Sequence, residues 1–191
     1  MTERLALLIA LALNLSMAVI EVVAGLLSRS VVLLADAVDF VEDSAVYVLA
    51  LLVGAQKPEV KRRFGFVIAA LMAMPGLAAV VQVWRQLGAG AVPHGMTIWT
   101  VATLALLVNL ASAAVILAAR RGPQPESLGL RAAWLSSRND AFANIAMIAA
   151  GILVGLTQSG WPDIITGIGI AALHLSGAIA ILRRTLGGAA L

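Results

Sequence analysis

The chain alternates long apolar stretches with short polar breaks, a pattern typical of helices that cross a lipid bilayer. Six apolar stretches can be traced, at about 5–27, 31–54, 65–87, 97–119, 129–156 and 162–182, and a spanning helix uses about 20 apolar residues. The breaks hold turn-forming and charged residues, as in Ser28-Arg29-Ser30, Gln56 to Arg63 and Gly160-Trp161-Pro162. The pattern predicts an all-α membrane protein with six transmembrane helices in a single domain.

The composition supports a lipid environment. Hydrophobic residues make up 61% of the 191 residues and charged residues only 12%, whereas a soluble domain is about a quarter charged. This balance excludes a disordered chain, a nucleic-acid-binding protein and an ordinary soluble enzyme. Cysteine is absent, so no disulfide framework and no thiolate metal site is possible.

The positive charges predict the orientation in the membrane. Two arginines, Arg29 and Arg85, fall on one side of a six-span arrangement, and Arg138 lies within a span. The other basic residues all fall on the opposite side: Arg4, Lys57, Lys61, Arg62, Arg63, Arg120, Arg121, Arg131, Arg183 and Arg184. Because cytoplasmic loops are rich in Lys and Arg, both termini are predicted to be cytoplasmic. We expect a multi-pass protein of the cell (inner) membrane, with Trp84, Trp99 and Trp161 at its outer interface.

The second span carries four carboxylates in eight residues: Asp36, Asp39, Glu42 and Asp43. Helical geometry places Asp36, Asp39 and Asp43 on one face, with Glu42 at its flank. Neighbouring carboxylates repel one another, so they need protons, a cation or both. Arg138 is the basic residue within a predicted span, and one arginine cannot neutralise four acids.

The fifth span adds polar groups at a similar depth. Ser136 and Asp140 are one turn apart, and Asn139 lies beside them. We expect the two spans to bring Asp39, Asp43 and Asp140 together. Three carboxylates and a neutral oxygen from Ser136 or Asn139 would make a cage for a divalent cation.

Other polar residues in the spans have less specific interpretations. Glu21 is either a proton carrier or a hydrogen-bonding anchor, and with Asp36 and Glu42 it is a candidate to relay protons or to support the metal ligands. Asn109 is expected to join two helices through hydrogen bonds. His174, alone in the middle of the sixth span, is expected to pack there with a satisfied ring nitrogen, and metal ligation is the less favoured alternative. Asp163 is expected to interact with the dipole at a helix start.

These residues resemble those of the cation diffusion facilitators. The likeness is most specific in the second span, in Leu33-Leu34-Ala35-Asp36-Ala37 followed by Asp39-x-x-x-Asp43, and it extends to Asn14, Glu21 and Gly25 before it. Leu130 to Leu135 followed by Asp140 is similar to the family's fifth span, and Trp161-Pro162-Asp163 to its sixth. The resemblance implies a homodimer that exchanges protons for a divalent metal at Asp39, Asp43, Ser136 and Asp140, without any other cofactor.

The chain also departs from this family. Zinc transporters of the family usually have histidine in place of Ser136, and a site made of oxygen atoms suits manganese, magnesium or ferrous iron better than zinc. The transported ion is therefore left open among zinc, manganese, iron and cobalt. Many members also have a cytoplasmic C-terminal domain, which we do not expect here because the sequence ends shortly after Arg183-Arg184. The loop between spans two and three is basic, so no second metal site is expected there.

The sequence favours a secondary active transporter, not an enzyme: a proton-coupled exporter with its metal site in the middle of the membrane. One alternative is a membrane metal sensor or accessory subunit that binds metal without moving it. The missing imidazole and the missing C-terminal domain favour that alternative slightly. Another is an intramembrane enzyme that uses paired carboxylates such as Asp43 and Asp140, but four clustered acids exceed what such a pair needs.

Overall fold

The computed structural model describes residues 1–53, 58–120 and 128–186, which form six α-helices and no strand. In chain order these are α1 (Glu3–Ser28), α2 (Val31–Val53), α3 (Pro58–Ala89), α4 (Gly95–Arg120), α5 (Leu128–Thr157) and α6 (Trp161–Leu186). The side chains of residues 53, 58–65, 68, 120, 128–133, 135, 136, 138, 139, 181, 184 and 185 lie outside this description. Of the basic residues behind the predicted orientation, Lys57 and Arg121 lie outside the described ranges, as do the side chains of Lys61, Arg62, Arg63, Arg120, Arg131 and Arg184.

The helices end at residues with a left-handed backbone. Arg29 closes α1 with φ 57°, and Gln158 follows α5 with φ 52°. Gly90 follows α3 with φ 59°, a conformation that glycine adopts without steric cost. The break predicted from Gln56 to Arg63 is wrong for its second part, because α3 already begins at Pro58. Proline is favoured at a helix start, where its missing N–H would have no helical partner.

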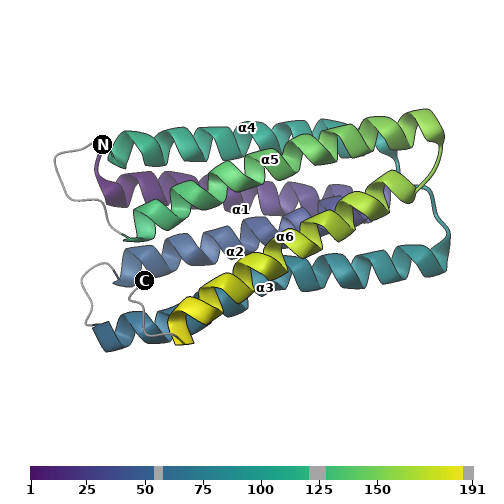
Figure 1. Ribbon diagram of the computed structural model, residues 1–191. Coiled ribbons are helices and arrows are strands. Elements are labelled where there is room, and N and C mark those ends of the chain that lie inside the picture. The colour runs from purple at the N-terminus through teal and green to yellow at the C-terminus, as the bar shows by residue number, and fades with distance from the viewer. Residues whose placement is uncertain (54–57, 121–127, 187–191) are drawn as a thin grey trace.

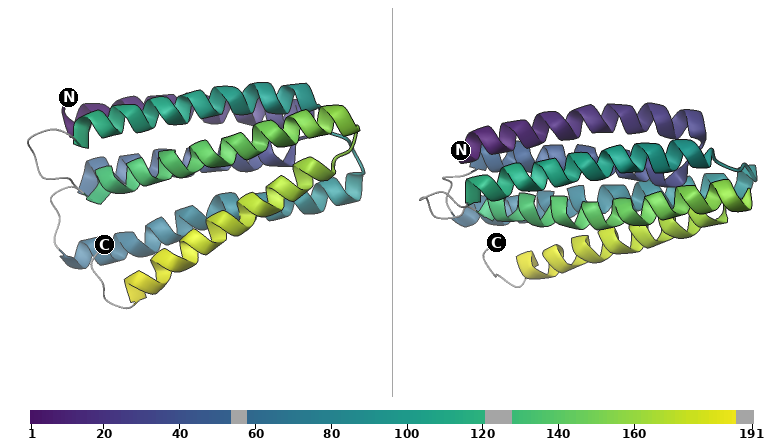
Figure 2. Two further views of the ribbon diagram at one scale, coloured as in Figure 1. Left: turned by 45° about the horizontal axis from the view of Figure 1, so that its top comes forward. Right: turned by 90° about the horizontal axis from the view of Figure 1, so that it is seen from above.

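The helices form an elongated bundle in which α2 is central (Figure 1). It contacts each of the other five described helices. Helices α4 and α5 pack closely together, and so do α3 and α6. In Figure 2 the α3–α6 pair lies to one side of the other helices. Both views show α6 diverging from α5 toward the end of the bundle where α6 ends.

Apolar packing encloses the middle of α2 from both directions along the bundle. Near the start of α2, Val32, Leu33 and Ala35 pack in one buried cluster with residues of α3, α4, α5 and α6. Toward its other end, Tyr47 packs with Leu7 of α1 and other buried residues. The carboxylates of α2 therefore lie between two apolar layers.

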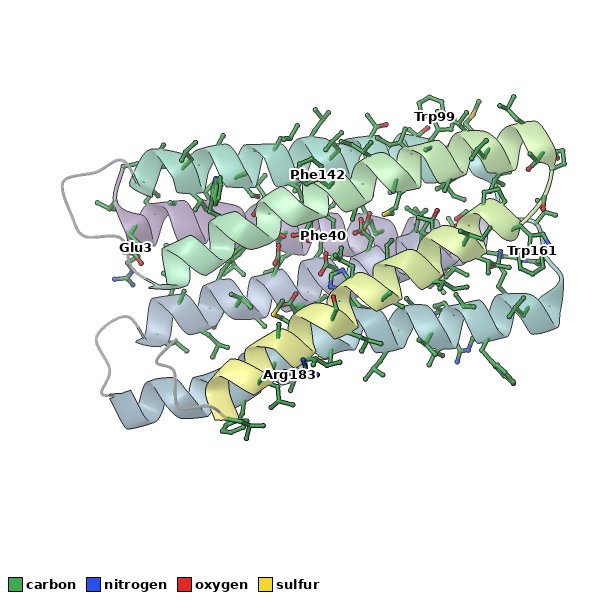
Figure 3. The ribbon with its side chains drawn as sticks, viewed as in Figure 1. Glu3, Phe40, Trp99, Phe142, Trp161 and Arg183 are labelled. Atoms are coloured by element: carbon green, nitrogen blue, oxygen red, sulfur yellow. The ribbon has the colours of Figure 1, made fainter. Side chains whose placement is uncertain are left out.

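The outer surface fits lipid. Four stretches within the described residues are long and apolar enough to cross a membrane: Glu3–Ser28, Gly95–Ala119, Asp140–Thr157 and Trp161–Ala180. Figure 3 places Trp99 and Trp161 toward one end of the bundle and Glu3 toward the other. Both tryptophans are exposed, as expected for side chains at a lipid–water interface. The predicted fold class, an all-α membrane protein, is confirmed.

Candidate metal site

The four acids of α2 are all buried in the middle of the bundle. None of them is more than 3% exposed, and Figure 3 shows their neighbour Phe40 about midway along the helices. Because α2 contacts all five other described helices, even the acid on the flank of its polar face, Glu42, is buried. Burial of this kind is costly unless each group finds a proton, a hydrogen-bond donor or a cation.

Asp36 pairs with an acid of α1. Its carboxyl group faces that of Glu21, close enough for a hydrogen bond when one of the two carries a proton. Glu21 is completely buried. Neither of its carboxylate oxygens, nor Oδ2 of Asp36, meets an N–H or O–H donor among the described residues. The pair is therefore able to hold a proton, in line with the relay or support role predicted for both residues.

Asp39, Glu42 and His174 form the tightest group of possible ligands among the described residues. One ligand atom from each lies within 4.8 Å of the other two. Nδ1 of His174, on α6, is 3.4 Å from Oδ1 of Asp39, and the imidazole is 8% exposed. His174 was predicted to pack with a partner for its ring nitrogen, and the structure places a carboxylate oxygen of Asp39 beside Nδ1.

Asp43 has a different set of neighbours. The hydroxyl of Tyr47, one turn later on α2, donates to Oδ2 of Asp43 at 3.2 Å and lies 3.0 Å from Oγ of Ser137 on α5. Tyr47 is fully buried. It thus orients Asp43 and links α2 to α5. Neither Tyr47 nor Ser137 was among the predicted site residues.

Asp140 of α5 completes the group of buried acids. Among the other acids, Asp39 affects it most strongly and Asp43 next, so the charges of α2 act directly on this group. Its Oδ2 atom is buried without a hydrogen-bond partner in the described part of the chain. Three of the five predicted ligands, Asp39, Asp43 and Asp140, are thus buried, but among the described residues they do not form a group whose ligand atoms all lie within 4.8 Å of one another. Ser136 and Asn139 lie outside the described side chains, and the ligand set as a whole stays a prediction.

Three buried asparagines lie on helices of the bundle, and one of them joins two helices. Asn14 of α1 donates to Oγ of Ser112 on α4 at 3.2 Å. Asn144 donates to the backbone oxygen of Asp140 at 3.0 Å, within α5. Asn109 is buried, and neither atom of its amide group has a hydrogen-bond partner among the described residues. Among the described residues, Asn14, and not Asn109, is therefore the asparagine whose side chain joins two helices.

The chain was compared with known proteins. Residues 7–187 match the cation efflux transmembrane domain. The chain is 28% identical over 193 residues to the zinc transporter ZitB of Yersinia pestis, covering 94% of this chain and 60% of that protein. It is 29% identical over 178 residues to ZitB of Escherichia coli, covering 86% and 55%. It is 26% identical over 167 residues to the metal cation efflux system protein CzcD of Cupriavidus metallidurans, covering 81% and 52%.

The chain spans little more than half the length of these relatives. The matched domain, in contrast, extends over nearly all of the chain and includes every acid of the candidate site. The resemblance seen in the sequence is confirmed, and the chain belongs to the cation efflux family, the cation diffusion facilitators.

Proposed function

We propose that the chain exports divalent metal cations of the zinc, manganese, iron and cobalt class across the inner membrane in exchange for protons. One observation carries the proposal: acids of α2 and α5 are buried in the middle of a membrane-spanning bundle, and Oδ1 of Asp39 and Oδ2 of Asp140 have no donor within the described part of the chain. The relatives support it, since two are named as zinc transporters and one as a metal cation efflux protein.

In this proposal the cation binds to Asp39, Asp43 and Asp140, and Ser136 or Asn139 supplies a further oxygen. A divalent cation neutralises most of the charge that makes this cluster costly in lipid. The same oxygens bind protons, so metal affinity falls as they become protonated. Protons that enter from the side of release therefore displace the metal. They stay on the carboxylates while the site turns back to the cytoplasmic side, and are released there. Glu21 and Asp36 are placed to hold such protons.

Access to the site would alternate as one group of helices moves against another. Many transporters rock one helix group against another around a fixed site, and the divergence of the α3–α6 pair from α5 in Figure 2 supports such a division. Helix α3 has an exposed apolar surface that includes Leu77, Val80 and Trp84. This surface would contact lipid or a second copy of the chain. We propose a homodimer that uses α3 and α6.

Metal flux into proteoliposomes tests the export function. Asp140→Asn keeps the shape of the side chain but removes one ligand charge, and we expect it to abolish zinc and manganese flux. Glu3→Gln is the matched control, because it makes the same acid-to-amide change in the first turn of α1. Wild-type flux in Asp140→Asn would contradict the proposed site.

Flux measurements also separate transport from sensing. A sensor or accessory subunit would bind metal in equilibrium titrations while proteoliposomes showed no flux at any metal concentration. Proton coupling is read from a pH dye trapped inside the vesicles. An antiporter changes the internal pH as metal moves, and acidification of the side of metal release speeds export. Metal movement with no pH change would exclude exchange for protons.

A further inference from the structure

We propose that His174 is a metal ligand, so that Asp39 and Glu42 of α2 and His174 of α6 hold the transported cation between them. The proposal rests on the proposed function and deepens it, since it names a side chain that sets the preference for one class of metal. It also brings α6 to a site predicted from α2 and α5 alone.

The distances fit coordination of one ion. Zinc lies about 2.0–2.2 Å from nitrogen and oxygen ligands, so two ligands at a tetrahedral angle are about 3.3–3.5 Å apart. Nδ1 of His174 and Oδ1 of Asp39 are 3.4 Å apart. The ligand atom of Glu42 lies within 4.8 Å of both. A small movement of one carboxylate is enough to place all three around one cation.

The lack of hydrogen-bond donors for the buried carboxylate oxygen also points to a cation. Oδ1 of Asp39 is buried and has no hydrogen-bond donor among the side chains that the structure describes, even though the imidazole is its neighbour. Asp39 is 3% exposed and His174 8% exposed, so water does not readily replace the missing donor. A buried carboxylate oxygen without a donor is costly, and a metal ion between it and the ring nitrogen removes that cost.

Charge balance favours this ligand set. Two carboxylates and one neutral imidazole bind a divalent cation with no net charge, which is the least costly state in a membrane interior. The three carboxylates of the set proposed above, Asp39, Asp43 and Asp140, would leave one negative charge around the same ion, and the two sets share Asp39. The group of Asp39, Glu42 and His174 therefore suits a dication in this setting.

The ligand chemistry indicates which cations would bind. Imidazole favours zinc, cobalt and ferrous iron, whereas magnesium and calcium take oxygen ligands. The family's usual imidazole is absent at Ser136, and here α6 supplies one beside the same carboxylates. We therefore expect zinc-class selectivity despite the serine, which reverses the expectation drawn from Ser136 alone.

The chain has two histidines, and this makes a direct test possible. His94 is exposed, with Nδ1 3.2 Å from Oγ1 of Thr97, so His94→Asn should leave the site intact. In this variant, freed of any affinity tag, every imidazole signal comes from His174. Zinc-edge X-ray absorption of the zinc-loaded variant should show the scattering pattern of a coordinated imidazole. Zinc bound with oxygen ligands only would overturn the inference.

Binding affinities give a second test, with His94→Asn as the matched control. His174→Asn should weaken zinc binding about tenfold or more, the scale on which metal sites respond to the loss of supporting groups. Manganese binding should change much less, because oxygen ligands suffice for manganese. Unchanged zinc affinity in His174→Asn, with zinc flux intact in the wild type, would refute the role of His174 alone. Absence of binding and flux in the wild type would refute the proposed function itself.

Discussion

Replacing Asp163 tests how α6 is fastened to α2 at the end of the bundle where both helices begin. Asp163 is completely buried in the first turn of α6. Its Oδ1 accepts a hydrogen bond from Oγ of Ser30 at 2.7 Å, and its Oδ2 accepts one from the backbone N–H of Val31 at 2.7 Å. The acid predicted to serve the start of its own helix thus also holds the first turn of α2.

The size of the effect follows from these two bonds. A hydrogen bond to a charged group contributes about 1.5–3 kcal/mol, and a buried donor left without a partner is costly. Asp163→Asn retains one acceptor oxygen but places an NH₂ group against a donor, so we expect a loss of about 1.5–3 kcal/mol. Asp163→Ala removes both acceptors and should cost about 3–6 kcal/mol.

A double-mutant cycle with Ser30→Ala isolates the contact between the two helices. We expect Ser30 and Asp163 to couple by about 1–2 kcal/mol, within the range for residues in direct contact. The measurement is the free energy of unfolding of the purified protein, transferred from a mild detergent into sodium dodecyl sulfate. Thr157→Val is the control, because Thr157 bonds only within its own helix at an exposed position and should change stability by less than about 0.5 kcal/mol. Zero coupling, together with wild-type stability of Asp163→Asn, would show that the two helix starts are not joined in this way.

Three further predictions concern packing and the metal site. Gly151→Ala should destabilise the protein by about 1–3 kcal/mol in the same unfolding assay, because the new Cβ would lie 2.5 Å from the backbone nitrogen of Trp99. Gly155→Ala, where a Cβ meets nothing within 4 Å, should not. Tyr47→Phe should weaken metal binding in equilibrium titrations by about tenfold, since Asp43 loses the hydroxyl that orients it, and unchanged affinity would show that Asp43 needs no such support. Ser136→His should shift flux in a zinc–manganese competition further toward zinc, and an unchanged ratio would show that position 136 does not contact the ion.

Much of the fold could be predicted because its signals are local. The lengths of the apolar stretches and the turn residues between them indicate six helices without any knowledge of their packing. The acids of α2 could also be predicted as site residues. Asp36, Asp39 and Asp43 are costly in an apolar stretch unless they face one another or an ion. Asp140 stands out in α5 on the same argument.

Partners on different helices could not be predicted in this way, because they depend on helix tilt and rotation. His174 lies 13 residues after the start of α6 at Trp161, whereas Asp39 lies 8 residues after the start of α2 at Val31. At a rise of 1.5 Å per residue, the difference of 5 residues places the two about 7.5 Å apart in depth. The oblique course of α6 across the bundle in Figure 1 shortens its rise along the bundle axis, and this brings the two side chains level.

The two contacts between α2 and α6 differ in kind, and the difference bears on the transport cycle. At the start of both helices Asp163 makes hydrogen bonds that need no ion. Halfway along, in our proposal, the ion itself joins Asp39 to His174, and beyond this point α6 and α5 diverge (Figure 2). When the cation leaves, the hydrogen bonds of Asp163 still attach α6 to α2 where the helices begin. The angle between the two helices would then depend on whether metal is bound, and such a dependence is what couples the departure of an ion to a change in access.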